Sequence, residues 1–504
     1  MPTTTETRVS DEALRDRLVQ AFKGRRGEAT TADLVATTGL PLDRVEAELP
    51  SISDEFGARL RVTESGELLY SFPKGLRSRY RGFGPSLSRF WKAFKKGAVE
   101  AAILLFKAWI VVMLVGYFVL FIALAIVALV ASVAMRSSGR DGDNDRGGGI
   151  GGVFLTGRLL DTIFNIWFYS EVFKDPRQRA WEADARDRKR RERRPLHKAI
   201  FSFVFGEPDP NTNWDEVERK AVLAWLQAHK GIITMPEFRA VTGLAPLQAE
   251  DRITRYLKDF RGKPEVSEAG TLYYAFPDLL RRADSAPAGS GLVIPLQRLR
   301  PFSANKGKAN FWFGAINLVN LLFGAYFLYN ASVPHSFRTV MVRGREVIAA
   351  GGDFLYIVTA QLAKAAGIAD PAGLIAVALG FVPLTFAGLF YAIPALRRLR
   401  LARQNERIRF ENLRRFAYKE VLDHPEGMKS TAIKPDHEEA KPGDPRAAER
   451  ILVELAAAEG GEPGVDDSWT WPATARARKD AELLRAAIKS GDFALGKTVF
   501  DSHE

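Results

Sequence analysis

Long uncharged apolar runs constrain the fold of this chain more than any other feature of its sequence. Residues 108–135 carry no charged side chain, and the run is longer than the ~20 residues that a helix needs to cross a bilayer. Residues 311–331 and 372–395 are also uncharged and long enough. Because a segment in lipid must satisfy its own backbone hydrogen bonds, each run predicts a membrane-spanning helix, and Pro383 predicts a kink in the last one.

A further crossing is expected at residues 149–173, where Arg158 and Asp161 interrupt an apolar stretch. These two residues lie three positions apart, so they can pair on one helix face inside the membrane. Lys and Arg dominate the residues on both sides of this hairpin, 73–99 and 174–198. The positive-inside rule therefore requires the chain to return through the membrane between them. A re-entrant segment and a helix on the membrane surface are the alternatives for 149–173.

The same rule predicts a second membrane hairpin, residues 309–395, with both ends in the cytosol. The residues before it, 281–308, contain six Lys or Arg and one Asp. The run after it, 397–415, contains eight Arg and two Glu. Between the two spans, residues 340–366 are amphipathic, and we expect them to lie on the membrane surface or to cap the external side.

The formal net charge of +12 is explained by two basic runs, 174–198 and 397–415. Each run carries an excess of six positive charges, and each follows an apolar segment. Positive residues at such places anchor a membrane protein to the cytosolic leaflet. The expected partners of these runs are therefore anionic lipid headgroups rather than nucleic acid.

The chain also repeats a small module at a fixed offset of 204 residues. Residues 11–76 and 215–280 match without a gap at 19 of 66 positions, far more than chance gives. The stretch TESGELLYSFPKGL, for example, returns as SEAGTLYYAFPDLL. The pattern predicts an internal duplication.

Each copy of the repeat predicts three helices followed by a hairpin. In the first copy we expect helices at 11–22, 30–37 and 42–56, the last with Pro50 as a point where it can break. A Thr-Gly-Leu turn follows the second helix, and the end of the repeat alternates about a Ser-Gly turn, as hairpins do. This order resembles the winged-helix domain, a relative of the helix-turn-helix. Gly66 and Gly270 are then the turns of the two wings.

The winged-helix resemblance raises the question of DNA binding, which this fold often performs with its third helix. Here the third helix of the first copy carries five acidic residues and one Arg, and its counterpart at 246–260 is mixed. An acidic helix repels phosphate. Contact with a protein partner through the wing is the favoured use, and packing of one copy against the other is the alternative.

Residues 201–216, FSFVFGEPDPNTNWDE, read as an apolar strand-like run that ends in turn-forming residues. Followed by a winged-helix-like copy, this phrase resembles an uncharacterised family of bacterial and plastid membrane proteins. Some plant members of that family are labelled with iron–sulfur cluster biosynthesis. Because the chain contains no Cys, direct carriage of a cluster on thiolate ligands is not expected.

The sequence contains no convincing motif for catalysis or for a bound cofactor. Its six His residues are scattered, without the paired spacing of a zinc site. The Gly-rich stretch 147–152 lacks the Gly-Lys-Ser/Thr of a phosphate loop, and the Ala-Gly-Ser-Gly at 288–291 lacks the strand and helix around a nucleophilic serine. We therefore predict a protein that is not an enzyme, with no cofactor and no metal.

The predicted fold is mainly α: a polytopic α-helical membrane protein of about four spans with two cytosolic winged-helix-like α+β modules. The predicted parts, in chain order, are winged-helix-like module 1 (1–80), membrane hairpin 1 (100–173), a basic stalk helix and linker (174–214), winged-helix-like module 2 (215–282), membrane hairpin 2 (309–395), a basic helix (396–423), a flexible linker (424–445) and an acidic helical tail (446–504).

The expected function is that of a non-enzymatic scaffold or assembly factor in a bacterial inner membrane, multi-pass, with both termini in the cytosol. The polar N-terminal segment lacks the apolar core of a cleaved secretory signal, which agrees with this orientation. The expected partners are the lipid bilayer, an unidentified protein and, as an open alternative, further copies of the same chain. Two alternative functions remain: a small transporter or oligomeric channel regulated by the modules, and a membrane-tethered DNA-binding regulator.

Overall fold

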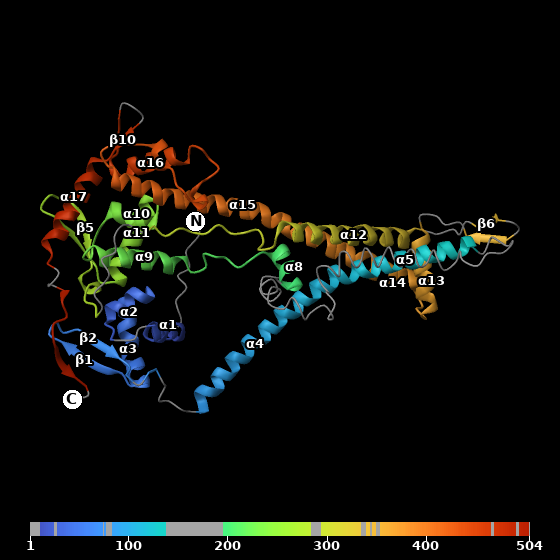
Figure 1. The fold of residues 1–504 in the computed structure, drawn as a ribbon, viewed down its shortest axis with the longest axis horizontal. Helices are drawn as coiled ribbons and strands as arrows, with labels where there is room; N and C mark the ends of the chain where they lie inside the picture. The colour runs from blue at the N-terminus through green and yellow to red at the C-terminus, as the bar shows by residue number, and fades with distance from the viewer. Residues whose placement is uncertain are drawn as a thin grey trace, which may run out of the picture. The chain divides into compact units, whose positions relative to one another are not determined.

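The computed structural model describes residues 11–24, 28–73, 75–76, 83–137, 195–283, 294–333, 339–342, 345–348, 353–464, 468–489 and 493–502 (Figure 1). The chain divides into two compact units. The module unit comprises Met1–Ser88, Asp209–Arg300 and Ala402–Glu504, and the helical unit comprises Arg89–Pro208 and Pro301–Leu401.

The first module has the predicted order of elements: α1 (Asp11–Gly24), α2 (Thr31–Thr38), α3 (Leu42–Phe56), β1 (Arg59–Thr63) and β2 (Leu68–Ser71). Thr30 caps α2 in a capping box with Asp33, and Gly39 ends the helix with a φ of +70°. Both features follow from local sequence rules, because threonine satisfies free N–H groups and glycine adopts the left-handed conformation at little cost. α3 continues through Pro50, and the neighbouring Leu49 and Ile52 are fully buried.

The second module contains α9 (Trp214–Ala228), β3 (Ile232–Thr234), α10 (Met235–Thr242), α11 (Pro246–Asp259), β4 (Lys263–Val266), β5 (Leu272–Ala275) and η4 (Pro277–Leu279). Its strand pairing repeats that of the first module 204 residues later. Ala29 pairs with Tyr70 and Ile233 with Tyr274, both antiparallel. Every register position of the first hairpin therefore has its counterpart in the second.

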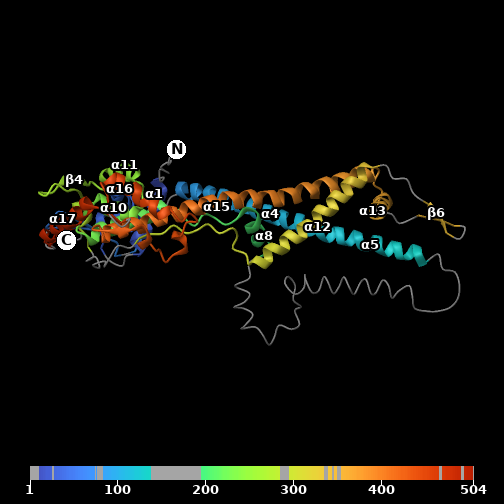
Figure 2. The same cartoon turned by 90° about the horizontal axis from the view of Figure 1, so that it is seen from above.

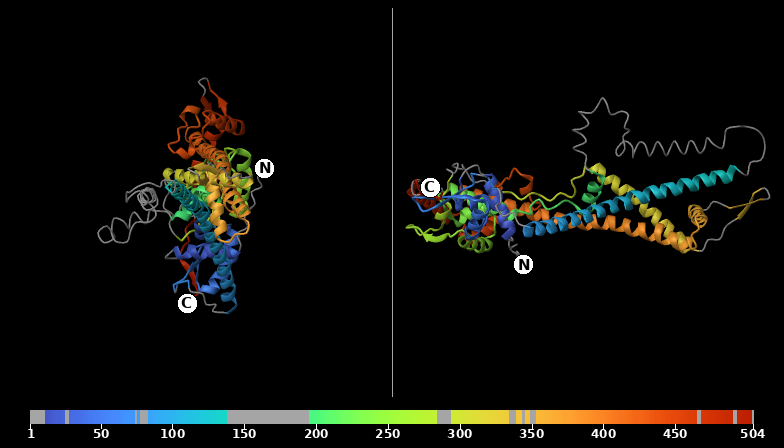
Figure 3. Two further views of the ribbon diagram at one scale, coloured as in Figure 1. Left: turned by 90° about the vertical axis from the view of Figure 1, so that its right-hand side faces the viewer. Right: turned by 90° about the horizontal axis from the view of Figure 1, so that it is seen from below.

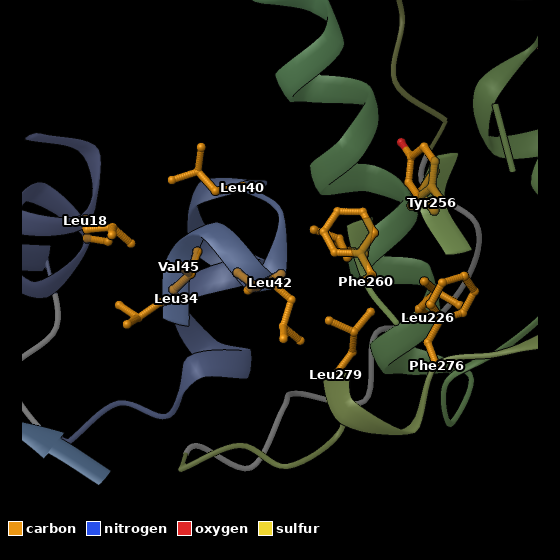
Figure 4. Close-up of a cluster of buried hydrophobic side chains, with 14 of the residues drawn as sticks. Leu18, Leu34, Leu40, Leu42, Val45, Leu226, Tyr256, Phe260, Phe276 and Leu279 are labelled. Atoms are coloured by element: carbon orange, nitrogen blue, oxygen red, sulfur yellow. The ribbon is translucent and has the colours of Figure 1, made fainter. Parts of the chain in front are cut away.

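The two modules bury their apolar side chains in one hydrophobic cluster. Leu34 and Leu42 of the first module belong to the same cluster as Leu226, Phe260 and Leu279 of the second (Figure 4). All five side chains are at most 2% exposed. The copies thus pack against each other, as one interpretation of the repeat predicts, and form a single body rather than two separate domains.

The C-terminal residues of the module unit form α16 (Ala447–Glu459), α17 (Pro472–Ala487), a small sheet of β8 (Met428–Lys429), β10 (Ser468–Thr470) and β9 (Glu462–Pro463), and β11 (Thr498–Asp501). The two helices lie within the predicted helical tail. Residues 424–445, which the sequence predicts as a flexible linker, differ from that prediction. They contribute β8 to the sheet and bury Met428, Ile433 and Ala440, so apolar contact fixes a stretch that looks polar in sequence.

In the described part of the chain, three helices have the length and apolar composition to cross a membrane: Gly97–Val133, Gly307–Ser332 and Pro371–Asp423. They are built from α4 (Phe83–Val111), η1 (Val112–Gly116), α5 (Tyr117–Ser137), α12 (Gly307–Ser332), α14 (Pro371–Leu374), η5 (Ile375–Phe381) and α15 (Val382–Asp423). Figures 2 and 3 show α12, α15 and the continuous α4 and α5 as long helices. Residues 149–173, the predicted return span, lie outside the described residues.

Two π-helical segments, η1 and η5, interrupt these helices, and each is bonded by a side chain from another helix. Asn320 donates from Nδ2 to the Leu114 carbonyl in η1 over 2.8 Å, and the Tyr117 hydroxyl donates to the Ala378 carbonyl in η5 over 2.9 Å. A π-helical turn leaves carbonyl groups without their usual partner, so these donors offset its cost.

Glycine allows close contact where α12 crosses η5. A Cβ on Gly324 would lie 3.0 Å from the Leu384 nitrogen, and one on Gly380 would lie 3.0 Å from the Leu328 Cα. Only a residue without a side chain lets two backbones approach this closely. By contrast, Gly314 and Gly388 have no atom within 4 Å of such a Cβ.

Two segments of the helical unit differ from the sequence predictions. Residues 201–205 belong to a helix, α8 (Leu196–Phe205), whereas the sequence predicts a strand-like run there. Short apolar runs fit either structure, and α8 is buried against Phe313 and Phe390. Instead of one amphipathic segment over 340–366, the chain forms a hairpin of β6 (Thr339–Val342) and β7 (Arg345–Ile348), followed by α13 (Phe354–Ala365).

Candidate functional site

The two hairpin turns, which the sequence predicts as wing turns, have the geometry for which glycine is suited. We call the hairpin of β1 and β2 the first wing and that of β4 and β5 the second wing. Gly66 has a φ of +79°, and its N–H donates to the Thr63 carbonyl over 2.9 Å. Gly270 has a φ of +83° and donates to the Ser267 carbonyl over 2.9 Å. Because no atom lies within 4 Å of a Cβ built on either glycine, backbone conformation rather than space explains the residue type.

The second wing presents a pair of exposed apolar side chains beside its turn. Val266 on β4 pairs with Leu272 on β5, and these residues are 66% and 48% exposed. In the first wing, Leu68 is 39% exposed, and β11 adds Val499 and Phe500, which are 69% and 59% exposed. Both wings therefore expose apolar side chains.

The outer edge of the first wing is covered by β11, the last strand of the described chain. Asp501 accepts hydrogen bonds from Arg59, one of them from Nε over 2.9 Å, and the Leu60 N–H donates to Ser502 Oγ over 3.0 Å. In the second wing, Pro264 occupies the position of Leu60 and has no N–H to donate. Among the described residues, β4 pairs with β5 alone. Proline on an edge strand discourages further pairing there.

The third helix of the first module directs acidic groups toward the second module. Arg261 donates from Nε to Asp43 over 2.9 Å and from Nη2 to Glu46 over 2.6 Å. Arg261 has a φ of +51°, and its counterpart 204 residues earlier is Gly57, with a φ of +64°. The arginine thus keeps a conformation that favours glycine while its side chain joins the two modules.

The acidic residue of each capping box also binds an arginine from a later part of the chain. Asp33 is fully buried and accepts from Arg282 Nε over 2.9 Å. Glu237 caps α10 and accepts from Arg485 Nη2, on α17, over 2.7 Å. The same carboxylate position therefore connects the first module to the second and the second module to the C-terminal helix.

A polar pocket of about 380 Å³ lies where α9, α11 and α15 meet. Five Arg, four Asp or Glu, two Gln and Trp214 line it, together with Gly243 and Leu244. The lining residues are Trp214, Asp215, Glu218, Gly243, Leu244, Gln248, Asp251, Arg252, Arg255, Gln297, Arg407, Glu411, Arg414 and Arg415. All of them belong to the module unit. Its volume is in the range of small-ligand sites, but its wall is far more charged than most.

The inner wall of this pocket holds a buried pair of opposite charges that is not hydrogen-bonded. Glu218 and Arg415 are each 2% exposed, and Arg415 Nη2 lies 3.9 Å from Glu218 Oε2. Arg252 Nη1 lies 3.7 Å from the other oxygen, Oε1. Among the described residues, Glu218 Oε1 and Arg415 Nε have no hydrogen-bond partner. Burial raises the pKa of the Glu218 carboxyl, while the positive charges of Arg252 and Arg415 oppose that rise.

Arg415 is held from several sides. Its guanidinium lies 4.7 Å from the centre of the Trp214 ring, and Nη1 donates to Asn412 Oδ1 over 3.2 Å. A Cβ on Gly243 would overlap the Arg415 side chain and lie 3.0 Å from its Nε. The sequence places Arg415 in a basic run expected to bind lipid headgroups, but the structure buries this member of the run inside the module unit.

The remaining residues that the sequence singles out either lie outside the described residues or do not come together in one site. Arg158 and Asp161, the predicted intramembrane pair, lie in a segment that the structure does not describe. In the part of the chain that is described, no group of three or more His, Asp or Glu residues is arranged to hold a metal ion. Glu218 is not predicted as a site residue from the sequence, although a charged residue on the buried stripe of α9 is a usable signal.

Comparison with known proteins gives one distant relative. The chain is 24% identical over 417 residues to an uncharacterized chloroplastic protein of Arabidopsis thaliana, and the match covers 80% of this chain and 71% of the plant protein. No protein-family model matches the sequence. No solved structure matches it either. The similarity extends over most of both chains. The relative is a plastid protein, which agrees with the family resemblance noted from the sequence.

Proposed function

We propose that this chain is a non-enzymatic membrane scaffold or assembly factor whose two winged-helix-like modules present protein-contact surfaces at the cytosolic face of a bacterial inner membrane. In this proposal residues 149–173 complete about four membrane crossings, and both termini are cytosolic. The modules descend from one duplicated unit of module and membrane anchor.

The observation that carries the proposal is the exposed apolar pair on the second wing. Val266 and Leu272 are 66% and 48% exposed and lie side by side across the hairpin. An exposed apolar side chain gains free energy when a partner covers it, by roughly 25 cal/mol for each Å² removed from water. The first wing supports the same proposal, because β11 adds the exposed side chains of Val499 and Phe500 to it.

The third helices support a protein partner rather than DNA. Asp43 and Glu46 on α3 are already bound to Arg261, and their charge opposes phosphate. On α11, Asp251 and Arg252 line the polar pocket and face α15. A recognition helix needs a basic face for the major groove, whereas α3 carries Asp43 and Glu46, and Asp251 lies beside Arg252 on α11.

The proposal is tested by placing charge on the second wing. In the full-length protein, Val266→Glu combined with Leu272→Glu should reduce the co-purification of its membrane-derived partner about tenfold, which corresponds to ~1.4 kcal/mol. The matched control is Leu247→Glu, because Leu247 on α11 is 79% exposed but lies on the third helix. Partner recovery that is unchanged in the wing variant, or lost only in the Leu247 variant, would refute the proposal.

A further inference from the structure

We propose that the pocket between α9, α11 and α15 binds a small oxyanion that carries a hydrogen, of the phosphate or phosphomonoester class. The pocket lies entirely within the module unit and contains none of the wing residues. Its occupant is therefore separate from the protein partner proposed above.

The inner wall holds one acceptor and two donors that make no hydrogen bond among the described residues. Glu218 Oε1 accepts no hydrogen bond among the described residues, and Arg414 Nε and Arg415 Nε donate none. A buried polar atom without a partner costs about 1–3 kcal/mol. A ligand that offers both an O–H donor and negatively charged oxygens would satisfy these groups together.

The buried charges cannot satisfy one another at their present distances. Arg252 and Arg415 approach Glu218 to 3.7 Å and 3.9 Å, beyond the 2.7–3.2 Å range of N–H···O hydrogen bonds. Arg415 cannot simply move closer, since Trp214, Asn412 and the backbone at Gly243 hold it in place. The surrounding residues therefore fix the distances between Glu218 and the two arginines. A ligand hydroxyl that accepts from an arginine and donates to Glu218 can connect them.

The negative charges of the other acidic residues in the pocket do not prevent an anion from binding. Glu411 already accepts from Gln297 Nε2 over 2.8 Å and from Arg407 Nε over 2.9 Å, so its charge is compensated. Asp215 and Asp251 are exposed, where water and salt screen them. Guanidinium groups suit oxyanions because their N–H groups match two oxygens at once.

The unpaired Glu218 oxygen decides which oxyanion fits. Hydrogen phosphate and a singly protonated phosphomonoester can donate their O–H to Glu218 Oε1 and accept from the arginines. Sulfate has no hydrogen at neutral pH, so its oxygens would face the carboxylate and be repelled. The volume of about 380 Å³ exceeds that of the bare ion and leaves space for a small organic group.

Calorimetric titration of the full-length protein in detergent micelles tests this inference. At fixed ionic strength, inorganic phosphate or glycerol phosphate should bind about tenfold more tightly than sulfate, a difference of ~1.4 kcal/mol. Glu218→Gln should abolish or invert that preference, because the amide can donate to sulfate. A structural role for Glu218 alone would not exchange one anion for the other.

A second pair of variants removes one positive charge inside or outside the pocket. Arg252→Gln should weaken phosphate binding about tenfold. Arg403→Gln, on the exposed surface of the same α15 that forms one wall, should leave it unchanged. Binding to vesicles that contain phosphatidic acid, without binding of the free ions, would identify a lipid headgroup as the source of the phosphomonoester. Equal affinity of the wild type for phosphate and sulfate, an unchanged preference in Glu218→Gln, or equal effects of the two arginine variants would overturn the inference.

Discussion

Alanine in place of glycine at two equivalent helix ends should have unequal costs. Gly39 ends α2 with a φ of +70°, and Gly243 ends α10, 204 residues later, with a φ of +65°. An L-residue with a side chain is disfavoured in this left-handed conformation by about 1 kcal/mol. The conformational cost is therefore nearly the same at both positions, and any difference must come from the surroundings.

The surroundings differ sharply between the two sites. A Cβ at position 39 would lie 3.6 Å from Lys220 Cγ, which is ordinary contact, so Gly39→Ala should cost about 1 kcal/mol. A Cβ at position 243 would overlap the side chain of Arg415, which is buried and cannot swing into water. Overpacking adds about 1–3 kcal/mol, so Gly243→Ala should cost about 2–4 kcal/mol.

Hydrogen exchange of the full-length protein, read by mass spectrometry, measures both costs locally. Amides of α10 and α11 should exchange faster in Gly243→Ala by a factor that corresponds to about 2–4 kcal/mol. Those of α2 and α3 should change by about 1 kcal/mol in Gly39→Ala. Equal effects in the two variants would refute the reasoning, because they would mean that Arg415 yields without cost.

Four further predictions follow from the described contacts. Arg261→Gly should be nearly neutral, because relief of the left-handed conformation offsets the lost surface ion pairs, whereas Arg261→Ala should cost about 0.5–1 kcal/mol in chemical denaturation. Asp501→Ala should release β11 and speed amide exchange in β1 and residues 498–502, at a cost of about 1 kcal/mol, since Arg59 is partly exposed. Burial lowers the pKa of His229, so the folded state favours the neutral ring. The stabilisation is complete above the unfolded-state pKa of about 6.5 and is lost as the pH falls through the lower folded-state pKa, so the amides of α17 should exchange faster as the pH falls below about 6.5. His229→Gln should remove this pH dependence. Asn320→Ala should weaken the contact of α12 with η1 by about 1 kcal/mol in detergent unfolding, because it removes the hydrogen bond to the Leu114 carbonyl.

Each of these predictions has a result that contradicts it. Arg261→Gly as costly as Arg261→Ala would show that the ion pairs, not the backbone, dominate. Unchanged exchange in β1 after Asp501→Ala would mean that β11 is held without its arginine contact. An acid effect that persists in His229→Gln must have another origin. For Asn320, the control is Asn330→Ala, which removes a bond to Tyr326 in its own helix, and an equal loss there would contradict a cross-helix role.

Local rules predicted the elements of the modules well. The left-handed glycines at 39 and 243 and the hairpin turns at Gly66 and Gly270 all depend on residues within a few positions of one another. Such preferences act before any tertiary contact forms, which is why they can be read from one sequence. The long helix after the last apolar run also ends as predicted, at Asp423.

The features that the sequence did not predict depend on distant contacts. β11 pairs with β1 across more than 430 positions, and nothing in Thr-Val-Phe-Asp specifies that partner. The run that forms α8 is ambiguous because its apolar residues satisfy either period, and only burial against α12 and α15 selects the helix. Arg415 looks like any other residue of a basic run until Trp214 and Glu218 enclose it.

Site-specific photocrosslinking from position 272 in intact membranes tests the proposed scaffold function most directly. The probe replaces Leu272 on the exposed second wing, and an equivalent probe at Leu247 on the third helix serves as the comparison. We predict a discrete protein adduct from position 272 that is lost when Val266 is changed to Glu, and a much weaker adduct from position 247. No protein adduct at position 272, or an adduct only at position 247, would contradict it.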